Sequence, residues 1–272
     1  MSMLELPVLT ESAEWSVRLI EADTAKVIAE HAPGRLLKTA SVGKTFLLAE
    51  VARQISVGTL DAMQTITPTA ADVVADSGIL YLMKQKEMRI DDLCLLIGAV
   101  SDNTATNMLL RRIGLRAVQE ATRELGFVES GMRDRVRLNR PVDDALTLSS
   151  GTAAELCELV RRIEAGEIHN ADVSAQIREW LAVNTDLSMV AQCFGLDPLA
   201  HTELDNGFQL WNKTGTISDA RIDIGCVRHD RSRRSIGYAV LANWPLGTDP
   251  RDEVLGSMRS IGLGIREYLE RI

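Results

Sequence analysis

Strand-like segments lie at both ends of the 272-residue chain, and helix-like segments fill the region between them. Residues 15–21 and 26–30 alternate apolar and polar side chains around a short polar turn, which is the pattern of a β-hairpin. Residues 208–212, 222–228 and 235–243 show a similar pattern near the other end. Because strands need hydrogen-bonded neighbours, we expect the two ends to form one antiparallel sheet.

The region between the two sets of strands is predicted to be helical. Glycine and proline punctuation and capping residues such as Thr152 delimit the expected helices, which are 41–57, 91–100, 104–113, 152–164, 171–183, 186–194 and, after the last strand, 250–272. We therefore expect two lobes, an α/β sheet lobe made of residues 1–38 and 192–272 and an all-helical lobe made of residues 39–191. A cleft is expected where the lobes meet.

The first expected helix opens with a Ser-x-x-Lys sequence, Ser41 to Lys44. Residues three apart share one face of a helix, so the Lys44 amine can reach the Ser41 hydroxyl. A serine becomes a nucleophile when a nearby base removes its proton, and a buried lysine can be that base. Two alternatives remain open, a simple N-cap serine and the end of a phosphate-binding loop. The loop is disfavoured because its first glycine position is occupied by Lys38.

Composition narrows the possible partners. The net charge is −8 and the isoelectric point about 5.2, which argues against nucleic acid as a partner. No apolar run approaches the length of a membrane span, and no basic leader precedes one, so we expect a cytoplasmic protein with no membrane partner. The four cysteines are widely separated among apolar neighbours, which predicts buried free thiols and neither a metal site nor a cofactor.

Two further polar triplets fall at the ends of expected elements. Ser101-Asp102-Asn103 lies in the turn between two helices, 60 residues after Ser41, and Lys213-Thr214-Gly215 ends a strand, 172 residues after it. Each triplet alone is typical of an ordinary turn or strand end. Three such motifs in this order, on these elements, are difficult to obtain by chance.

With these three motifs the chain resembles the serine penicillin-recognising enzymes, and most closely the class A β-lactamases. The resemblance runs from residue 15 to the terminal helix and includes residues 180–185 and 211–216. It implies a β-lactamase/transpeptidase-like fold, with an antiparallel sheet flanked by helices and an inserted helical lobe. It also implies a serine hydrolase that forms an acyl-enzyme with a small-molecule acyl substrate, a β-lactam or an ester.

The resemblance further implies a role for each matching residue. Ser41 attacks the carbonyl, Lys44 is a candidate base and Ser101 relays the proton to the leaving amine. The N–H groups of Ser41 and Thr216 form the oxyanion hole. Lys213 is implied as a further catalytic residue, which adds positive potential. The residues implied in substrate binding are Asn103, Thr214, Gly215, Thr216 and, as a carboxylate-binding arginine on the next strand, Arg221. A surface arginine at a strand end is the alternative for Arg221.

The chain departs from the class A pattern in the loop 127–148. That pattern places a glutamate four residues before an asparagine, and here Arg135 stands four residues before Asn139. A guanidinium does not act as a base at neutral pH, and Asp134 could substitute if the loop were shifted by one residue. We therefore expect slow deacylation. A small-ester hydrolase, a DD-peptidase-like enzyme and a β-lactam sensor that is acylated without turnover are the alternatives.

Two other features bear on the resemblance. Cys94 stands where many class A enzymes have half of a disulfide, but the partner position is Leu48, so no bridge is expected there. A histidine-based triad is the other option for a serine hydrolase. None of the four histidines lies beside a Gly-x-Ser-x-Gly motif, and surface positions are expected for them.

Overall fold

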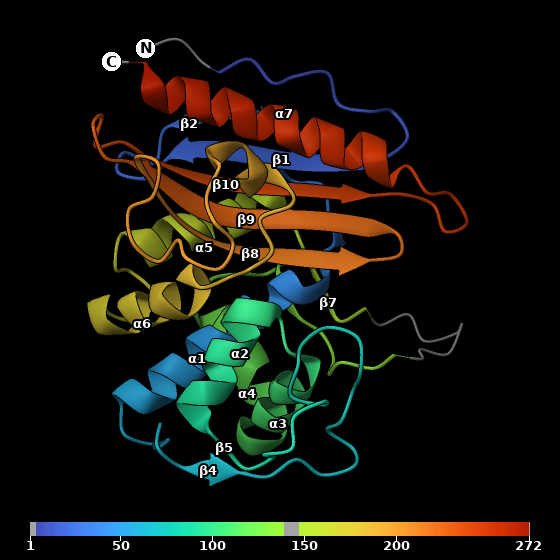
Figure 1. Cartoon of the computed structure of the whole chain (residues 1–272), viewed down its shortest axis with the longest axis vertical. Coiled ribbons are helices and arrows are strands. Elements are labelled where there is room, and N and C mark those ends of the chain that lie inside the picture. The colour runs from blue at the N-terminus through green and yellow to red at the C-terminus, as the bar shows by residue number, and fades with distance from the viewer. Residues whose placement is uncertain (1–3, 139–146, 272) are drawn as a thin grey trace.

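The computed structural model describes residues 4–138 and 147–271. Its largest sheet has five antiparallel strands, and both chain ends contribute to it (Figure 1). In space the strands are ordered β2-β1-β10-β9-β8. Their bounds are β1 Glu14–Glu21, β2 Val27–His31, β8 Phe208–Ile217, β9 Ala220–His229 and β10 Ser235–Asn243.

The helices surround this sheet and fill the region below it in Figure 1. They are α1 Lys44–Ser56, α2 Ile90–Val100, α3 Asn103–Ile113, α4 Leu115–Glu124, α5 Ala153–Glu164, α6 Ala171–Ala182 and α7 Arg251–Glu270, with the 3₁₀ helices η1 Ala40–Gly43 and η2 Val190–Phe194. Short strands complete the fold: β3 Leu37–Lys38, β4 Thr65–Ile66, β5 Met88–Arg89, β6 Gly131–Met132 and β7 Ser149–Gly151. None of the described helices combines the length and apolar character needed to cross a membrane.

Helices cover both faces of the sheet, which is why β9 and β10 are buried along nearly their whole length. Helix α7 packs Val254 and Met258 against one face, in a cluster that includes Val240 of β10. Helix α5 packs on the other face, where Val160 belongs to a cluster with Ile222. Strand β8 lies at the edge of the sheet, so alternate backbone N–H groups along it point away from β9.

The lower lobe is built around α1, whose residues 44–52 are all buried. Helices α2 and α6 approach so closely that a Cβ on Gly98 would lie 1.7 Å from the Trp180 carbonyl oxygen. The hydrophobic cluster that contains Val160 and Ile222 extends from the helical lobe onto the sheet. The boundaries of the two lobes, 1–38 with 192–272 and 39–191, stay a prediction.

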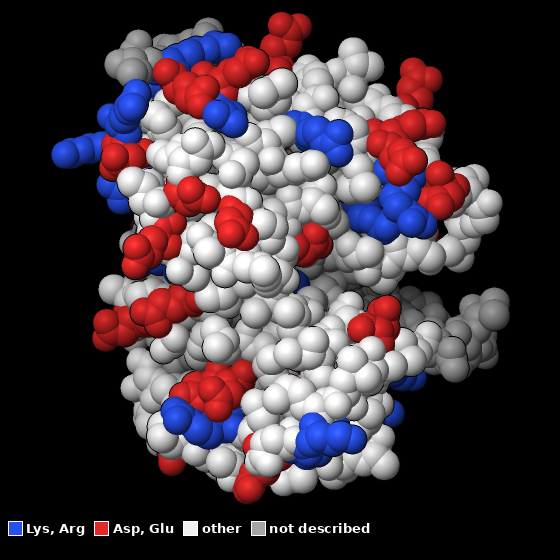
Figure 2. Space-filling view, in the orientation of Figure 1, with Lys and Arg blue, Asp and Glu red and all other residues white. Residues whose placement is uncertain are grey.

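On the molecular face drawn in Figure 2, acidic and basic side chains are interspersed.

Several predictions about local structure need correction. The helix predicted over 186–194 is wrong, since only the 3₁₀ helix η2 forms there. Its first residues are held in turns, because Asp186 Oδ1 accepts hydrogen bonds from the N–H and hydroxyl of Ser188. Strand β8 continues five residues beyond the predicted end at Asn212. Helix α4 was not predicted as a separate element.

Two expectations about individual side chains also change. Thr152 caps α5 by accepting the Glu155 N–H at 3.3 Å, but the Glu155 carboxylate binds backbone N–H groups of residues 128–130 instead of closing a capping box. His201 and His229 are buried, not on the surface. The four cysteines are free. Cys94, Cys157 and Cys226 are buried as predicted, whereas Cys193 is only half-buried.

Candidate active site

The Ser41 side chain begins the site, in the turn that leads into α1. Ser41 lies in η1, so the α-helix starts at Lys44 and not at the serine. Ala40 adopts a left-handed conformation with φ +47°, which is uncommon for a residue with a side chain and turns the chain sharply before the serine. Gly43 allows Ser149 to pack against the turn, since a Cβ there would lie 2.3 Å from the Ser149 Cβ.

Strand β8 runs directly alongside this turn. A Cβ on Gly215 would lie 2.5 Å from the Thr39 carbonyl oxygen and 3.3 Å from the Ser41 nitrogen. Only glycine permits this approach of two backbones. The Lys213-Thr214-Gly215 motif, separated from Ser41 by 172 residues, is thus placed beside the serine.

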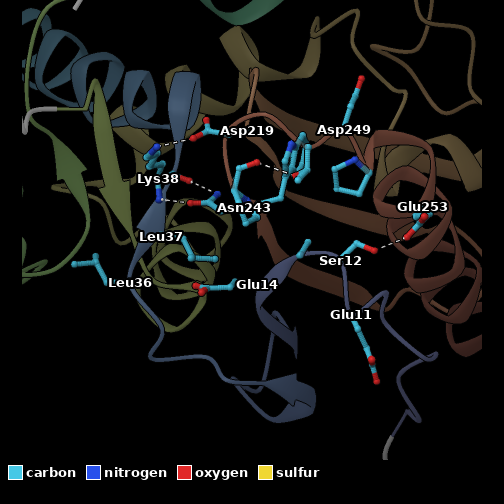
Figure 3. Close-up of a pocket in the computed structure, with 15 residues that line it drawn as sticks. Glu11, Ser12, Glu14, Leu36, Leu37, Lys38, Asp219, Asn243, Asp249 and Glu253 are labelled. Atoms are coloured by element: carbon cyan, nitrogen blue, oxygen red, sulfur yellow. Dashed lines mark hydrogen bonds and ion pairs between the residues drawn. The ribbon is translucent and has the colours of Figure 1, made fainter. Parts of the chain in front are cut away.

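Lys38, Asp219 and Asn243 form a polar clamp, the Lys38 clamp, that holds the chain just before the serine (Figure 3). The Lys38 ammonium pairs with the Asp219 carboxylate at 2.6 Å, and the Lys38 N–H donates to Asn243 Oδ1 at 2.8 Å. Asn243 Nδ2 in turn donates to the Lys38 carbonyl at 3.1 Å. These contacts fix β3 to the ends of β10 and of the β8–β9 hairpin. The same three residues line a separate cavity of about 930 Å³.

The Lys44 ammonium lies at the centre of the site and is fully buried. Its Nζ donates to the Ser101 carbonyl at 2.6 Å, to Asn103 Oδ1 at 2.8 Å and to Ser101 Oγ at 3.2 Å. Burial lowers the pKa of Lys44 well below its ordinary value, and the nearby positive charge of Lys213 lowers it further. Lys44 therefore loses its proton at a lower pH than an exposed lysine does.

The Ser101 hydroxyl links this lysine to the sheet. Ser101 ends α2 in a left-handed conformation with φ 55°. Its Oγ also accepts a hydrogen bond from Lys213 Nζ at 3.1 Å, so one hydroxyl oxygen contacts two lysine amines. Asp102 stabilises the turn by capping α3 and by accepting the N–H groups of Ile79 and Leu80.

Lys213 is supported by a buried polar network in the sheet. Burial lowers the pKa of Lys213 to about 8, against the opposing charges of Asp186 and Asp223. Burial also raises the pKa of Asp223 to about 7, although this carboxylate accepts hydrogen bonds from Asn212 and Tyr238. Lys213 and Asp223 thus change charge close to neutral pH.

The serines open onto a cleft of about 220 Å³. The described residues that line it are Ser41, Ser77, Ala99, Val100, Ser101, Asn184, Thr185, Asp186, Thr214 and Thr216. Four of the residues predicted from the motifs therefore meet in one cavity, with Lys44, Asn103 and Lys213 buried behind it. Arg221 is not in this lining. Its guanidinium donates to the carbonyls of Ile217 and Ala220 and lies 5.6 Å from the centre of a ring of Trp244.

The loop predicted to carry a base is held by a residue to which the sequence assigned no role. The Asn107 side chain accepts the Val136 N–H at 2.9 Å and donates to the Val136 carbonyl at 3.0 Å. Val136 is buried, whereas Arg135 is exposed. The Asp134 carboxylate is paired with Arg137 and accepts the Arg135 N–H. None of the described residues of this loop lines the cleft, and Asn139 lies outside the described residues.

Asn107 and Asp186 are the residues that sequence reasoning missed. Asn107 lies one helical turn after Asn103, so its position on the inward face of α3 was a usable signal. Asp186 lay in a segment predicted to be helical, and its role became visible only with the correct local structure.

Comparison with known proteins places the chain in a family. The model of the β-lactamase enzyme family matches residues 7–269. The chain belongs to that family. Among curated proteins, this family member is 28% identical to β-lactamase AST-1 of Nocardia asteroides over 186 residues, which cover 65% of this chain and 57% of the relative.

Solved structures bear out the predicted β-lactamase/transpeptidase-like fold. A β-lactamase from Sphaerobacter thermophilus superposes with a TM-score of 0.81 at 19% identity, covering 96% of this chain and 93% of that one. A variant of PBP-A, described as an acyl-enzyme complex with penicillin G, superposes with a TM-score of 0.79 at 18% identity, covering 97% and 92%. At these identities the similarity establishes the fold alone.

Proposed function

We propose that the protein is a serine hydrolase of the β-lactamase type, which forms an acyl-enzyme on Ser41 with β-lactams or related acyl donors. The observation that carries the proposal is the position of Ser101 Oγ between the amines of Lys44 and Lys213, in the cleft that Ser41 also lines. This arrangement supports a mechanism in which Ser41 is the nucleophile, Lys44 the buried base and Ser101 the proton relay.

Acylation begins when neutral Lys44 accepts the Ser41 proton and the Ser41 oxygen bonds to the substrate carbonyl carbon. The N–H groups of Ser41 and Thr216 stabilise the resulting oxyanion. The bond between that carbon and the leaving nitrogen then breaks. The leaving nitrogen takes a proton from the Ser101 hydroxyl, which is reprotonated from the Lys44 ammonium, so the base is restored. Lys213 supplies positive potential, and Thr214 and Asn103 bind the substrate.

Deacylation is proposed to be slow. Hydrolysis of the ester at Ser41 needs a base that activates a water molecule. Val136, which has no ionisable group, is the loop residue that Asn107 holds, and Asp134 is paired with Arg137. Both observations favour an acyl-enzyme that persists. They also support the second candidate, a β-lactam sensor that is acylated once and not turned over.

Intact mass measurement after mixing with benzylpenicillin tests the proposal. We expect an adduct with the mass of the whole β-lactam on Ser41 that decays slowly, and one equivalent of nitrocefin opened in a burst. Ser41→Ala should form no adduct, whereas the exposed Ser260→Ala should behave as the native protein. Steady nitrocefin turnover would exclude the sensor. Unchanged turnover in Ser41→Ala would refute the assignment of the nucleophile.

A further inference from the structure

The cavity of about 930 Å³ beside the Lys38 clamp, which we call the clamp cavity, is separate from the cleft that Ser41 lines. None of the described residues lines both. Four parts of the chain form its walls, namely residues 11–14, residues 36–38, the turn between β8 and β9, and the connection from β10 to α7. Its volume is in the range of cavities that hold a small organic ligand.

The wall of the clamp cavity is acidic. Its described residues carry one ammonium group, that of Lys38, and five carboxylates, those of Glu11, Glu14, Asp219, Asp249 and Glu253. Lys38 is paired with Asp219, and Asp249 is paired with Arg251, which is outside the wall. The three glutamates join no ion pair within the described part of the chain. Charge complementarity therefore favours a cationic occupant.

The unpaired carboxylates lie toward two ends of the cavity. Glu14 of β1 is the cross-strand neighbour of Asn243, a member of the Lys38 clamp. Glu253 of α7 accepts the Ser12 hydroxyl at 2.8 Å, and Figure 3 shows this pair on the side opposite Lys38. In the described chain, no three acidic or other ligating side chains are close enough together to hold a metal ion. An extended cation therefore matches this distribution of charge better than a compact one.

Much of the remaining wall is apolar, with contributions from Ala13, Leu36, Leu37, Trp244, Pro245 and Pro250. Such a surface can pack against methylene groups. Trp244 is 4% exposed, and its indole Nε1 donates to no atom in the described part of the chain. A buried donor without a partner is uncommon, and a ligand oxygen or a water molecule held with the ligand would satisfy it.

We propose that the clamp cavity binds an organic dication with an apolar spacer, such as a linear aliphatic diamine, and that Glu14 and Glu253 pair with its two ammonium groups. The spacer packs against the apolar wall. Because Asp219 lies at the clamp end of the cavity, the occupant also approaches the ion pair that holds the chain before Ser41. The inference does not depend on the acyl transfer proposed for Ser41.

Isothermal titration calorimetry at low ionic strength tests the proposal with four compounds of equal chain length: 1,8-diaminooctane, octylamine, 1,8-octanediol and suberate. We expect the diamine to saturate one site and to bind about three- to fivefold more tightly than octylamine, the gain typical of one exposed ion pair. The diol and the suberate dianion should show no saturable binding. Added salt should weaken binding of the diamine more than binding of the monoamine.

Glu14→Gln and Glu253→Gln each keep an oxygen acceptor but remove one charge. Each should bring the affinity for the diamine to within about twofold of that for octylamine. Glu267→Gln, which removes an exposed carboxylate of α7 outside the cavity, is the control and should keep the native preference. Lys38→Met leaves Asp219 unpaired and should raise the affinity for the diamine about threefold or more, a gain that damage to the fold would not produce.

The inference is overturned if the diamine does not saturate the protein or binds no more tightly than octylamine. It is also overturned if Glu14→Gln and Glu253→Gln leave the preference unchanged, or if Lys38→Met does not raise the affinity. A preference lost equally in Glu267→Gln contradicts it too, since the diamine would then respond to the net charge of −8 and not to the cavity. None of these results bears on the acylation of Ser41, which nitrocefin and benzylpenicillin test separately.

Discussion

Lys213 Nζ lies 3.1 Å from Ser101 Oγ, although the two residues are 112 positions apart in the chain. This contact joins the sheet to the helical lobe at the point where the leaving group is proposed to be protonated. Lys213→Met keeps much of the side-chain volume but removes both the charge and the hydrogen bond. We expect acylation by nitrocefin to slow by roughly 10²–10³, measured as the burst rate.

Lys213→Arg is the matched control for that substitution. It retains a positive charge and donors, so it should recover part of the lost rate, with the remainder reflecting the larger guanidinium in a fully buried position. Equal burst rates for native protein and Lys213→Met would exclude a role for this amine in acylation.

The pH dependence of acylation should show two limbs. The rate should rise as Lys44 loses its proton, at a pH well below that of an ordinary lysine, because burial and Lys213 lower its pKa. It should fall above a pH of about 8, where Lys213 loses its charge. Burst rates across this range test both limbs, and Lys213→Met should lack the fall at high pH.

Thermal unfolding separates that fall from loss of structure. The pKa of Lys213 is about 8 in the folded protein and 10.5 in its ordinary state. Between these values the unfolded chain binds more protons than the folded one, so the contribution of Lys213 to the free energy of unfolding rises with pH. Tm should therefore gain from Lys213 in the window where activity declines, and this gain should be absent in Lys213→Met.

Carboxylates placed at neighbouring loop positions test which of them can supply a base to the acyl-enzyme. The Asn107 side chain binds the N–H and the carbonyl of Val136, and we call this contact the Asn107 clamp. The clamp does not depend on the side chain at 136, so Val136→Glu should leave the loop backbone in place and supply a base for deacylation. We expect the acyl-enzyme to decay at least tenfold faster, within the range of general-base catalysis. Burying the new carboxylate should cost about 1–3 kcal/mol of stability.

Arg135→Glu is the control, because the spacing of the class A loop pattern points to this position while the structure leaves it exposed. It should not accelerate decay of the adduct, measured by intact mass over time. If Arg135→Glu accelerates decay and Val136→Glu does not, the side chain at 135 supplies the base position and the clamp has been misinterpreted.

The fold was largely predictable because its signals are local. Alternating strands at both ends and capped amphipathic helices predict the sheet and most helices. Motif order and spacing predicted that Ser41, Ser101 and Thr214 share a cavity, and the structure places them so. The roles of these residues stay predictions. They depend on chemistry that geometry alone does not test.

Other features depended on contacts that no local pattern contains. The 3₁₀ turn at Ser41 packs against β8 and Ser149, which are distant in the sequence. The turns around Asp186 replace a helix because polar side chains of Asn184 and Asp186 satisfy the backbone there. The hydrogen bonds from Asn107 of α3 to the backbone of Val136 likewise join residues far apart in the sequence.

The close approach of β8 to the Ser41 turn yields the last prediction. In Gly215→Ala, the added methyl group would lie 2.5 Å from the Thr39 carbonyl oxygen, so strand and turn must separate. We expect a loss of about 1–3 kcal/mol in stability. Because the displaced backbone carries the proposed nucleophile and the proposed oxyanion N–H groups, acylation should slow by roughly 10- to 100-fold.

Gly256→Ala is the matched control, since a Cβ at this position in α7 meets no atom within 4 Å. Alanine favours a helix over glycine, so this variant should gain up to about 1 kcal/mol and acylate at the native rate. Urea unfolding and nitrocefin burst rates for both variants provide the comparison. A Gly215→Ala protein with native burst rate would mean that the strand can retreat without moving Ser41. The positioning of the serine would then have to come from the Lys38 clamp and Ser149 instead.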